Sequence, residues 1–339
     1  MSIKYIYVAA FVFLSQALLA QIRTADLYGT WVVSKVTYRD GSPLPDEHML
    51  KYIYLKYSFS RPHKLNTSEV YFEQGTGKLF EINDRALLIR MPEGAVINSY
   101  HIVALRDTLI LLQKGMNGFE DPEALKFYFV PEALYQRSIP LQASDIFAIK
   151  GPDTIYRQSR KIYARYKGQS FQSYVYEGIS KQIDMDDRVG HFIATFTVSK
   201  TGLAEDIKIL EGIDEEYNSR FLKVFHQAKK DWEPAVLNGQ PVPVQMFVEV
   251  TYLTLYTSLP AVVFSQKGNQ AYNNKNYELA IYCYDKALDN KPTDIENLYK
   301  RGICKLLLNN KDAACDDWRR AKALGSSLAV DTMIEKHCQ

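Results

Sequence analysis

Cysteine is scarce in this 339-residue chain, which has four, and none precedes Cys283. No two of them are spaced as C-x-x-C, the pattern typical of structural zinc sites. The chain also lacks the motifs G-x-S-x-G, H-E-x-x-H and G-x-G-x-x-G, and a phosphate loop ending at Gly77-Lys78 would need glycine where Phe72 stands. We therefore expect a protein that is not an enzyme, with no catalytic residues, no metal site and no cofactor.

An excess of one charge is also missing, because 41 Lys and Arg residues nearly balance 39 Asp and Glu residues. No basic block is interleaved with aromatic residues, so nucleic acid and a broad anionic membrane surface are poor partners. The basic pairs Lys229-Lys230 and Arg319-Arg320 are interpreted as solvated faces of helices.

Residues 1–20 have the layout of a secretory signal peptide. Lys4 precedes an apolar run, and small residues end at Ala20, just before Gln21. The alternative is an uncleaved anchor, but the run is short for a span of about 20 residues. We expect cleavage near Ala20, a periplasmic or other envelope location, and no integral membrane segment in the mature protein.

Residues 21–130 alternate apolar and polar residues in about eight short segments, which predicts an antiparallel β domain. The first of these segments carries Gly29-Thr-Trp31. A Gly-x-Trp on a first strand resembles the lipocalin family, and this resemblance implies an eight-stranded barrel with Trp31 in a structural role. Such a barrel either encloses a small apolar ligand or is filled by its own side chains.

Residues 131–186 are interpreted as a linker followed by a helical run-in, because Pro140, Gly151 and Gly168 punctuate them. Three aspartates lie near the end of this segment or just after it: Asp184, Asp186 and Asp187. They lack the glycine and the distal glutamate of a calcium loop, so a polar approach to the next strand is the better interpretation.

Residues 187–255 predict two strands joined at Thr201-Gly202, an amphipathic helix from about Asp214, and a last strand. The motifs V-S-K-T-G, Trp232-Glu-Pro-Ala and Asn238-Gly-Gln-Pro-Val-Pro follow in order. In this order and spacing they resemble the C-terminal domain of TonB, which has a ββαβ fold.

The resemblance implies that the last strand is a sheet edge that accepts an extended peptide. The predicted protein-binding residues alternate along this strand: Val244, Met246, Val248, Val250 and Tyr252. The alternatives are a protected edge and a homodimer seam.

Residues 260–339 contain a repeat of 34 residues, in which Gly268 and Tyr284 recur as Gly302 and Trp318. This pattern resembles two tetratricopeptide repeats followed by a capping helix. Two repeats are few for independent stability, so we expect this domain to pack against the neighbouring domain or to be stabilised by a disulfide.

All four cysteines lie in this region, and an exported protein meets an oxidising compartment. Cys315 begins one predicted helix and Cys338 ends another, so antiparallel packing would bring them together, and envelope proteins with a similar repeat often have this pair. Cys283 and Cys304 either form a second disulfide or stay buried as small apolar residues.

The sequence thus predicts a multidomain protein: an all-β lipocalin-like barrel, an α+β (ββαβ) TonB-like domain and an all-α repeat pair. The expected function is that of an envelope binding or adaptor protein. Its partner would be an envelope protein or peptide, in one version an outer-membrane transporter, held by the edge strand and the repeat groove. The alternative is a carrier of a small apolar ligand in the barrel.

Overall fold

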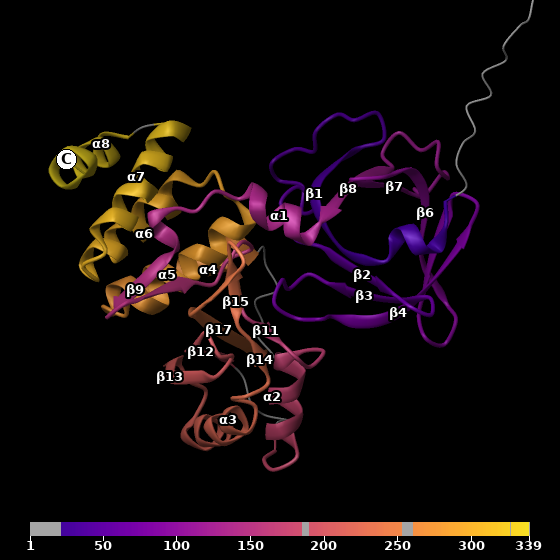
Figure 1. Ribbon diagram of the computed structural model, residues 1–339. Helices are drawn as coiled ribbons and strands as arrows, with labels where there is room; N and C mark the ends of the chain where they lie inside the picture. Colours follow the sequence, from indigo (N-terminus) through magenta and orange to yellow (C-terminus); the bar gives the residue numbers. More distant parts are fainter. Residues whose placement is uncertain (1–21, 185–189, 253–259, 326, 339) are drawn as a thin grey trace, which may run out of the picture.

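The computed structural model describes residues 22–184, 190–252, 260–325 and 327–338 (Figure 1). The predicted cleavage point at Ala20 and the aspartates Asp186 and Asp187 lie outside these ranges. Three parts can be recognised in Figure 1: a β-barrel, a mixed sheet with two helices beneath it, and a stack of helices that ends the chain.

The first part is a closed barrel of eight antiparallel strands, as the alternation predicts. Its strands are β1 (Gly29–Tyr38), β2 (Lys56–Ser60), β3 (Lys64–Ser68), β4 (Thr76–Asn83), β5 (Ala86–Arg90), β6 (Val96–Leu105), β7 (Leu109–Gln113) and β8 (Leu125–Pro131). Each strand pairs with its neighbours in sequence, and β1 closes the barrel against β8, from Trp31 opposite Pro131 to Tyr38 opposite Leu125.

The inside of the barrel is filled by its own side chains, which form one buried cluster. Tyr57 lies between Phe59 and Phe129, with ring centroids 6.1 and 4.9 Å away, and its hydroxyl is 3.0 Å from that of Tyr100. A short 3-10 helix, η1 (Thr24–Leu27), precedes β1. The Trp31 indole N–H donates to the Leu27 carbonyl at 2.8 Å, so Trp31 has the structural role predicted for it.

The segment after the barrel holds more regular structure than the predicted linker. It forms α1 (Glu132–Ser138), the 3-10 turn η2 (Ala143–Asp145), β9 (Ile146–Lys150), β10 (Asp153–Arg157), β11 (Arg165–Tyr166) and α2 (Phe171–Ser180). Helix α2 is the predicted run-in, and the Ser170 side chain caps it by accepting from the Ser173 amide. The linker interpretation was wrong for β9 and β10, which are two strands of the following sheet.

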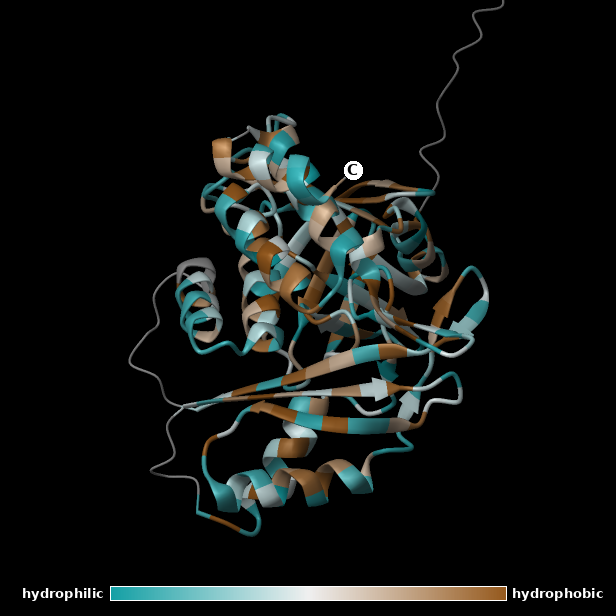
Figure 2. Cartoon of the chain, turned by 90° about the vertical axis from the view of Figure 1, so that its left-hand side faces the viewer, coloured by the Kyte–Doolittle hydropathy of each residue, from teal (hydrophilic) through white to brown (hydrophobic). Residues whose placement is uncertain are grey.

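The second part has a five-stranded sheet in the order β13-β12-β17-β10-β9. Its remaining elements are β12 (Gly190–Val198), β13 (Ala204–Glu211), α3 (Glu215–Gln227), β14 (Trp232–Glu233), β15 (Ala235–Leu237), β16 (Gln240–Val242) and β17 (Val244–Tyr252). Figure 2 shows helices on both faces of this sheet. On one face, side chains from β12 and β17 pack with α2 and α3 into a single core.

Two of the sequence motifs meet in this core. Gly202 has a φ of +79°, and a Cβ added to it would lie 2.5 Å from the Trp232 carbonyl oxygen. Only glycine therefore fits both the backbone conformation and the space at this position. Trp232 is itself buried, so the turn after β12 and the tryptophan before β15 form one packing contact.

The third part consists of α4 (Pro260–Asn273), α5 (Tyr277–Asn290), α6 (Ile295–Leu307), α7 (Lys311–Leu324) and α8 (Leu328–His337). A Cβ on Gly268 would lie 2.6 Å from the Tyr284 ring, and a Cβ on Gly302 would lie 2.4 Å from the Trp318 ring. The same glycine–aromatic contact thus recurs in both helix pairs, as the 34-residue spacing predicts.

Candidate binding surfaces

The strand predicted to bind a partner, β17, is not an edge strand. It lies inside the sheet, with β12 along one side and β10 on the other. The five predicted residues have side chains that are at most 9% exposed and belong to the core beneath the sheet: Val244, Met246, Val248, Val250 and Tyr252. These side chains form the core with α2 and α3, and the prediction that the strand is a sheet edge was wrong where β10 pairs with it.

Strand β10 covers only the first part of β17. The two strands pair in parallel, with Tyr156 opposite Val244 and Arg157 opposite Gln245. One residue further on, the Gln158 amide donates to the Gln245 carbonyl at 2.9 Å, and the Gln158 side chain accepts from the Phe247 amide at 2.8 Å. The protein's own chain therefore occupies the outer side of β17 as far as Phe247.

The outer side of β17 continues beyond that point. Backbone groups that face the same side of a strand alternate, so the N–H groups of Glu249 and Thr251 point away from β12, as that of Phe247 does. Within the described ranges, no strand pairs with Glu249 or Thr251 on this side. Thr251 is exposed and Glu249 is half-buried. Part of the edge predicted from the sequence therefore exists, but it is shorter and displaced along the strand.

The face of the sheet opposite α2 and α3 carries the helical region. The Phe247 ring packs on Tyr282 of α5, with centroids 4.9 Å apart, and the Tyr282 hydroxyl donates to Glu249 Oε2 at 2.6 Å. Ile193 of β12 joins the same buried cluster. The helices thus use the sheet as part of their core, as expected for a region with only two repeats.

A cavity of about 570 Å³ lies where the barrel, β10, β17 and the helices meet. Tyr71 of the β3–β4 loop and Phe247 supply part of its lining, and α5, α6 and α7 supply much of the rest. Its lining is rich in cationic residues: Arg157, Arg160, Lys161, Lys286, Arg301, Lys305 and Arg320. We call this space the junction cavity. Arg320 is half-buried here, so its interpretation as a solvated residue was wrong.

Behind the cavity wall lies a buried ion cluster. Asp317 of α7 is fully buried. Its Oδ2 atom accepts a hydrogen bond from Arg301 Nε at 2.8 Å and forms an ion pair with Lys305 Nζ at 2.8 Å. Arg301 also reaches Asp285 of α5 at 2.6 Å. Burial alone would raise the pKa of Asp317, but the two cations outweigh it and lower the pKa to about 2. Burial and the neighbouring Arg301 lower the pKa of Lys305 to about 8.

This cluster was missed in the sequence, although a signal for it exists. Arg301 and Lys305 are four residues apart on a helix whose apolar face is buried, and Asp317 directly precedes the repeat residue Trp318. Charged residues at inward positions of two neighbouring predicted helices indicate a buried ion pair.

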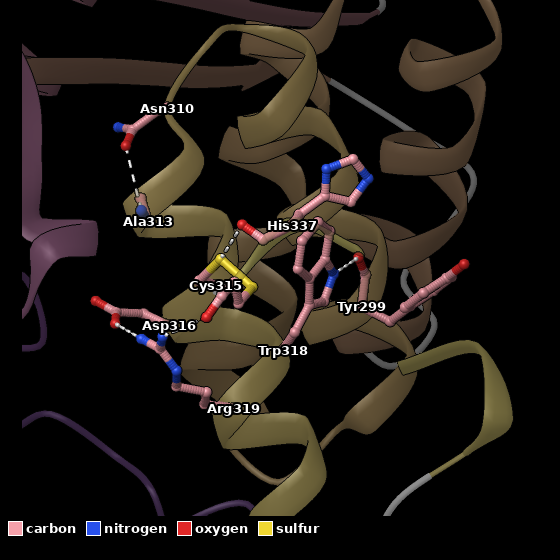
Figure 3. Close-up of a disulfide and its surroundings, with 9 residues drawn as sticks. Tyr299, Asn310, Ala313, Cys315, Asp316, Trp318, Arg319 and His337 are labelled. Carbon is pink, nitrogen blue, oxygen red and sulfur yellow. Dashed lines mark hydrogen bonds and ion pairs between the residues drawn. A yellow bond between two sulfur atoms is a disulfide. The ribbon is translucent and has the colours of Figure 1, made fainter. Parts of the chain in front are cut away.

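The predicted disulfide between Cys315 and Cys338 is present and ties α7 to the end of α8 (Figure 3). Next to it, the Trp318 indole N–H donates to the Tyr299 carbonyl at 3.2 Å. Cys283 and Cys304 are free thiols and fully buried, so the second of the two alternatives for them is the one observed. Burial raises the pKa of each thiol to about 12.

Among the residues that the structure describes, no group of three or more His, Cys, Asp or Glu side chains could hold a metal ion. Within the same residues, none of the helices combines the length and the apolar character needed to cross a membrane. No family model matches the chain, and no curated protein matches it. The function is therefore inferred from the geometry.

Proposed function

We propose that this protein is a non-enzymatic binding or adaptor protein of the cell envelope, which holds an extended partner segment against the outer side of β17. In this proposal the second part is a TonB-like domain, the barrel is lipocalin-like and the helices are a tetratricopeptide pair. The partner is an envelope protein or peptide, such as a segment of an outer-membrane transporter. Export by a cleaved signal peptide belongs to the same proposal.

One observation carries the proposal: β10 stops pairing with β17 after Gln158, and the backbone groups of Glu249 and Thr251 continue along the same side. An unpaired row of N–H and C=O groups is a template for an added strand. Glu249 and Thr251 offer few hydrogen bonds, each contributing about 1 kcal/mol net, and the entropy of association opposes them. Tight binding therefore needs a second contact, which we assign to the groove of the helical region.

The strand proposal is tested by comparing Glu249→Pro with Glu249→Ala in the full chain. Both variants lose the hydrogen bond from Tyr282, but only proline removes the outward N–H group. In a pull-down from envelope extract we expect Glu249→Ala to retain a partner that Glu249→Pro loses at least tenfold. Val248 is unsuitable for this test, because its N–H faces β12.

Circular dichroism would first establish that both variants are folded. A folded Glu249→Pro protein that retains the same partner as well as Glu249→Ala does would show that strand addition at this side is wrong. The carrier alternative is not proposed, because the inward side chains of the barrel form one packed cluster.

A further inference from the structure

We propose that the junction cavity binds a small soluble anion that carries phosphate or carboxylate groups. The cavity lies between the barrel loop that carries Tyr71, the end of β10, and helices α5 to α7. Its volume of about 570 Å³ falls in the range of small-molecule sites. This inference is independent of strand addition at β17.

The lining of the junction cavity carries an excess of positive charge. Seven lining residues are Arg or Lys, and three are Asp: Asp145, Asp285 and Asp289. Two carboxylates outside the lining also pair with these cations: Asp317 is shared by Arg301 and Lys305, and Glu249 lies 4.0 Å from Lys286. Even with both included, cations exceed carboxylates by two. A concave surface with such an excess attracts anions.

The cations of the lining differ in their partners. Lys161 donates to the carbonyls of Gln136 and Ile139, and Arg301 is held by two aspartates. In the described part of the chain, neither Arg157 nor Arg320 forms an ion pair, and Arg157 Nε is buried without a hydrogen-bond partner. Both residues belong to the cavity lining, so an anion bound there would lie beside two guanidinium groups that have no carboxylate partner among the described residues.

The surroundings of Arg157 and Arg320 disfavour their charged forms. Burial lowers the pKa of Arg157, and burial together with Arg301 lowers the pKa of Arg320. In both cases the nearby carboxylates offset these effects only in part, so a further negative charge would favour the charged form. A bound anion would supply it, and the planar guanidinium matches the two oxygens of a carboxylate or phosphate. The Arg157 guanidinium lies over the Phe147 ring, 5.2 Å from its centroid.

The experiment is isothermal titration calorimetry of the full chain with inorganic phosphate, inorganic pyrophosphate and citrate, each at constant ionic strength adjusted with sodium chloride. We expect saturable binding of one molecule per chain for at least one of the three probes. Arg157→Gln and Arg320→Gln should each weaken it roughly tenfold or more, since each removes a charged hydrogen-bond donor. Arg106→Gln, an exposed arginine beyond the end of β6, is the matched control and should leave the affinity unchanged.

Absence of saturable binding with all three probes would overturn the proposal, as would equal affinity in Arg157→Gln, Arg320→Gln and the control. Should Arg157→Gln fail to fold by circular dichroism, the half-buried Arg320 alone decides. Binding to phosphatidylglycerol vesicles without binding of any free probe would also refute a soluble ligand. Glu249 contacts Tyr282 and Lys286, which line the cavity, so the anion is titrated into the parent protein and the arginine variants and not into Glu249→Pro. Failure of strand addition in the pull-down and failure of anion binding in the calorimeter are thus separate results.

Discussion

The barrel and the helical region differ in how they bury enough apolar surface to be stable. Eight short strands close on themselves, so the barrel has an inside, and Tyr57, Phe59 and Phe129 fill it with ring contacts. The two helix pairs have no such enclosed space. Their buried residues fall into two smaller clusters, and one of these includes Ile193 and Phe247 of the sheet.

This difference indicates where each region obtains its stability. The barrel depends on dispersion and apolar burial among its own residues. The helical region has three further stabilising features. They are a surface shared with the sheet, the disulfide from Cys315 to Cys338, and the ion cluster around Asp317. Because these contributions differ, substitutions can destabilise the two regions separately.

The largest effect is expected from Asp317→Asn, which leaves Arg301 and Lys305 buried without their carboxylate. Breaking a buried ion pair in this way should lower the free energy of unfolding of the helical region by about 3–5 kcal/mol. Urea denaturation followed by circular dichroism at 222 nm measures this, and Asp312→Asn on the exposed side of α7 is the control. Hydrogen exchange of the barrel amides should not change.

The same carboxylate predicts a dependence on acid. Its pKa is lowered from 3.8 to about 2, so its contribution to stability is complete above about pH 4 and is lost as the pH falls through 2. Hydrogen exchange measured between pH 4 and 2 should therefore become faster in α6 and α7 than in the barrel. The opposite order would show that Asp317 is not the source of acid sensitivity.

A smaller effect is expected from reduction of the disulfide. The bond joins residues 23 apart, and in the chain-entropy model its loss costs about 3 kcal/mol. Reductant should therefore lower the melting temperature of the helical region. The double variant with Cys315→Ser and Cys338→Ser should melt at the lower temperature with or without reductant. Mass spectrometry would establish that the reductant has opened the bond. If the melting temperature of the parent protein is then unchanged, the disulfide does not stabilise the helical region.

The smallest effect is expected inside the barrel. Tyr57→Phe keeps the ring but removes one partner of the hydroxyl pair with Tyr100, which should cost about 1 kcal/mol. Tyr128→Phe, on the outer side of β8 beneath Lys35, is the control and should be neutral. Differential scanning calorimetry measures both variants. Loss of stability in the helices rather than the barrel would show that the two regions are not separable.

Local patterns in the sequence predicted much of the fold. Alternation gave the eight strands, because each faces a core on one side and solvent on the other. The spacing of Gly268 and Gly302 gave the helix pairs, because each glycine faces an aromatic ring at the same offset. The turn at Gly202 and the motif that begins at Trp232 were also visible in the sequence.

The remainder depends on contacts between residues distant in sequence. Strands β9 and β10 are short, and Pro140 and Gly151 beside them are typical of a linker, so no local pattern places them next to β17. That single omission made β17 an apparent edge. The junction cavity and the cluster of Arg301, Lys305 and Asp317 were missed for the same reason, since their members become neighbours only when three parts of the chain pack together.

The pairing of β10 with β17 also has a consequence for the order in which the chain is assembled. During synthesis from the N-terminus, every barrel strand is available once Pro131 has emerged, whereas β10 meets its partner only when Val244 and Gln245 have followed. Until then β10 has the β9 hairpin on one side and an open side on the other. A strand with one unpaired side can pair with another chain and aggregate, so during synthesis β10 is a segment that chaperones would protect.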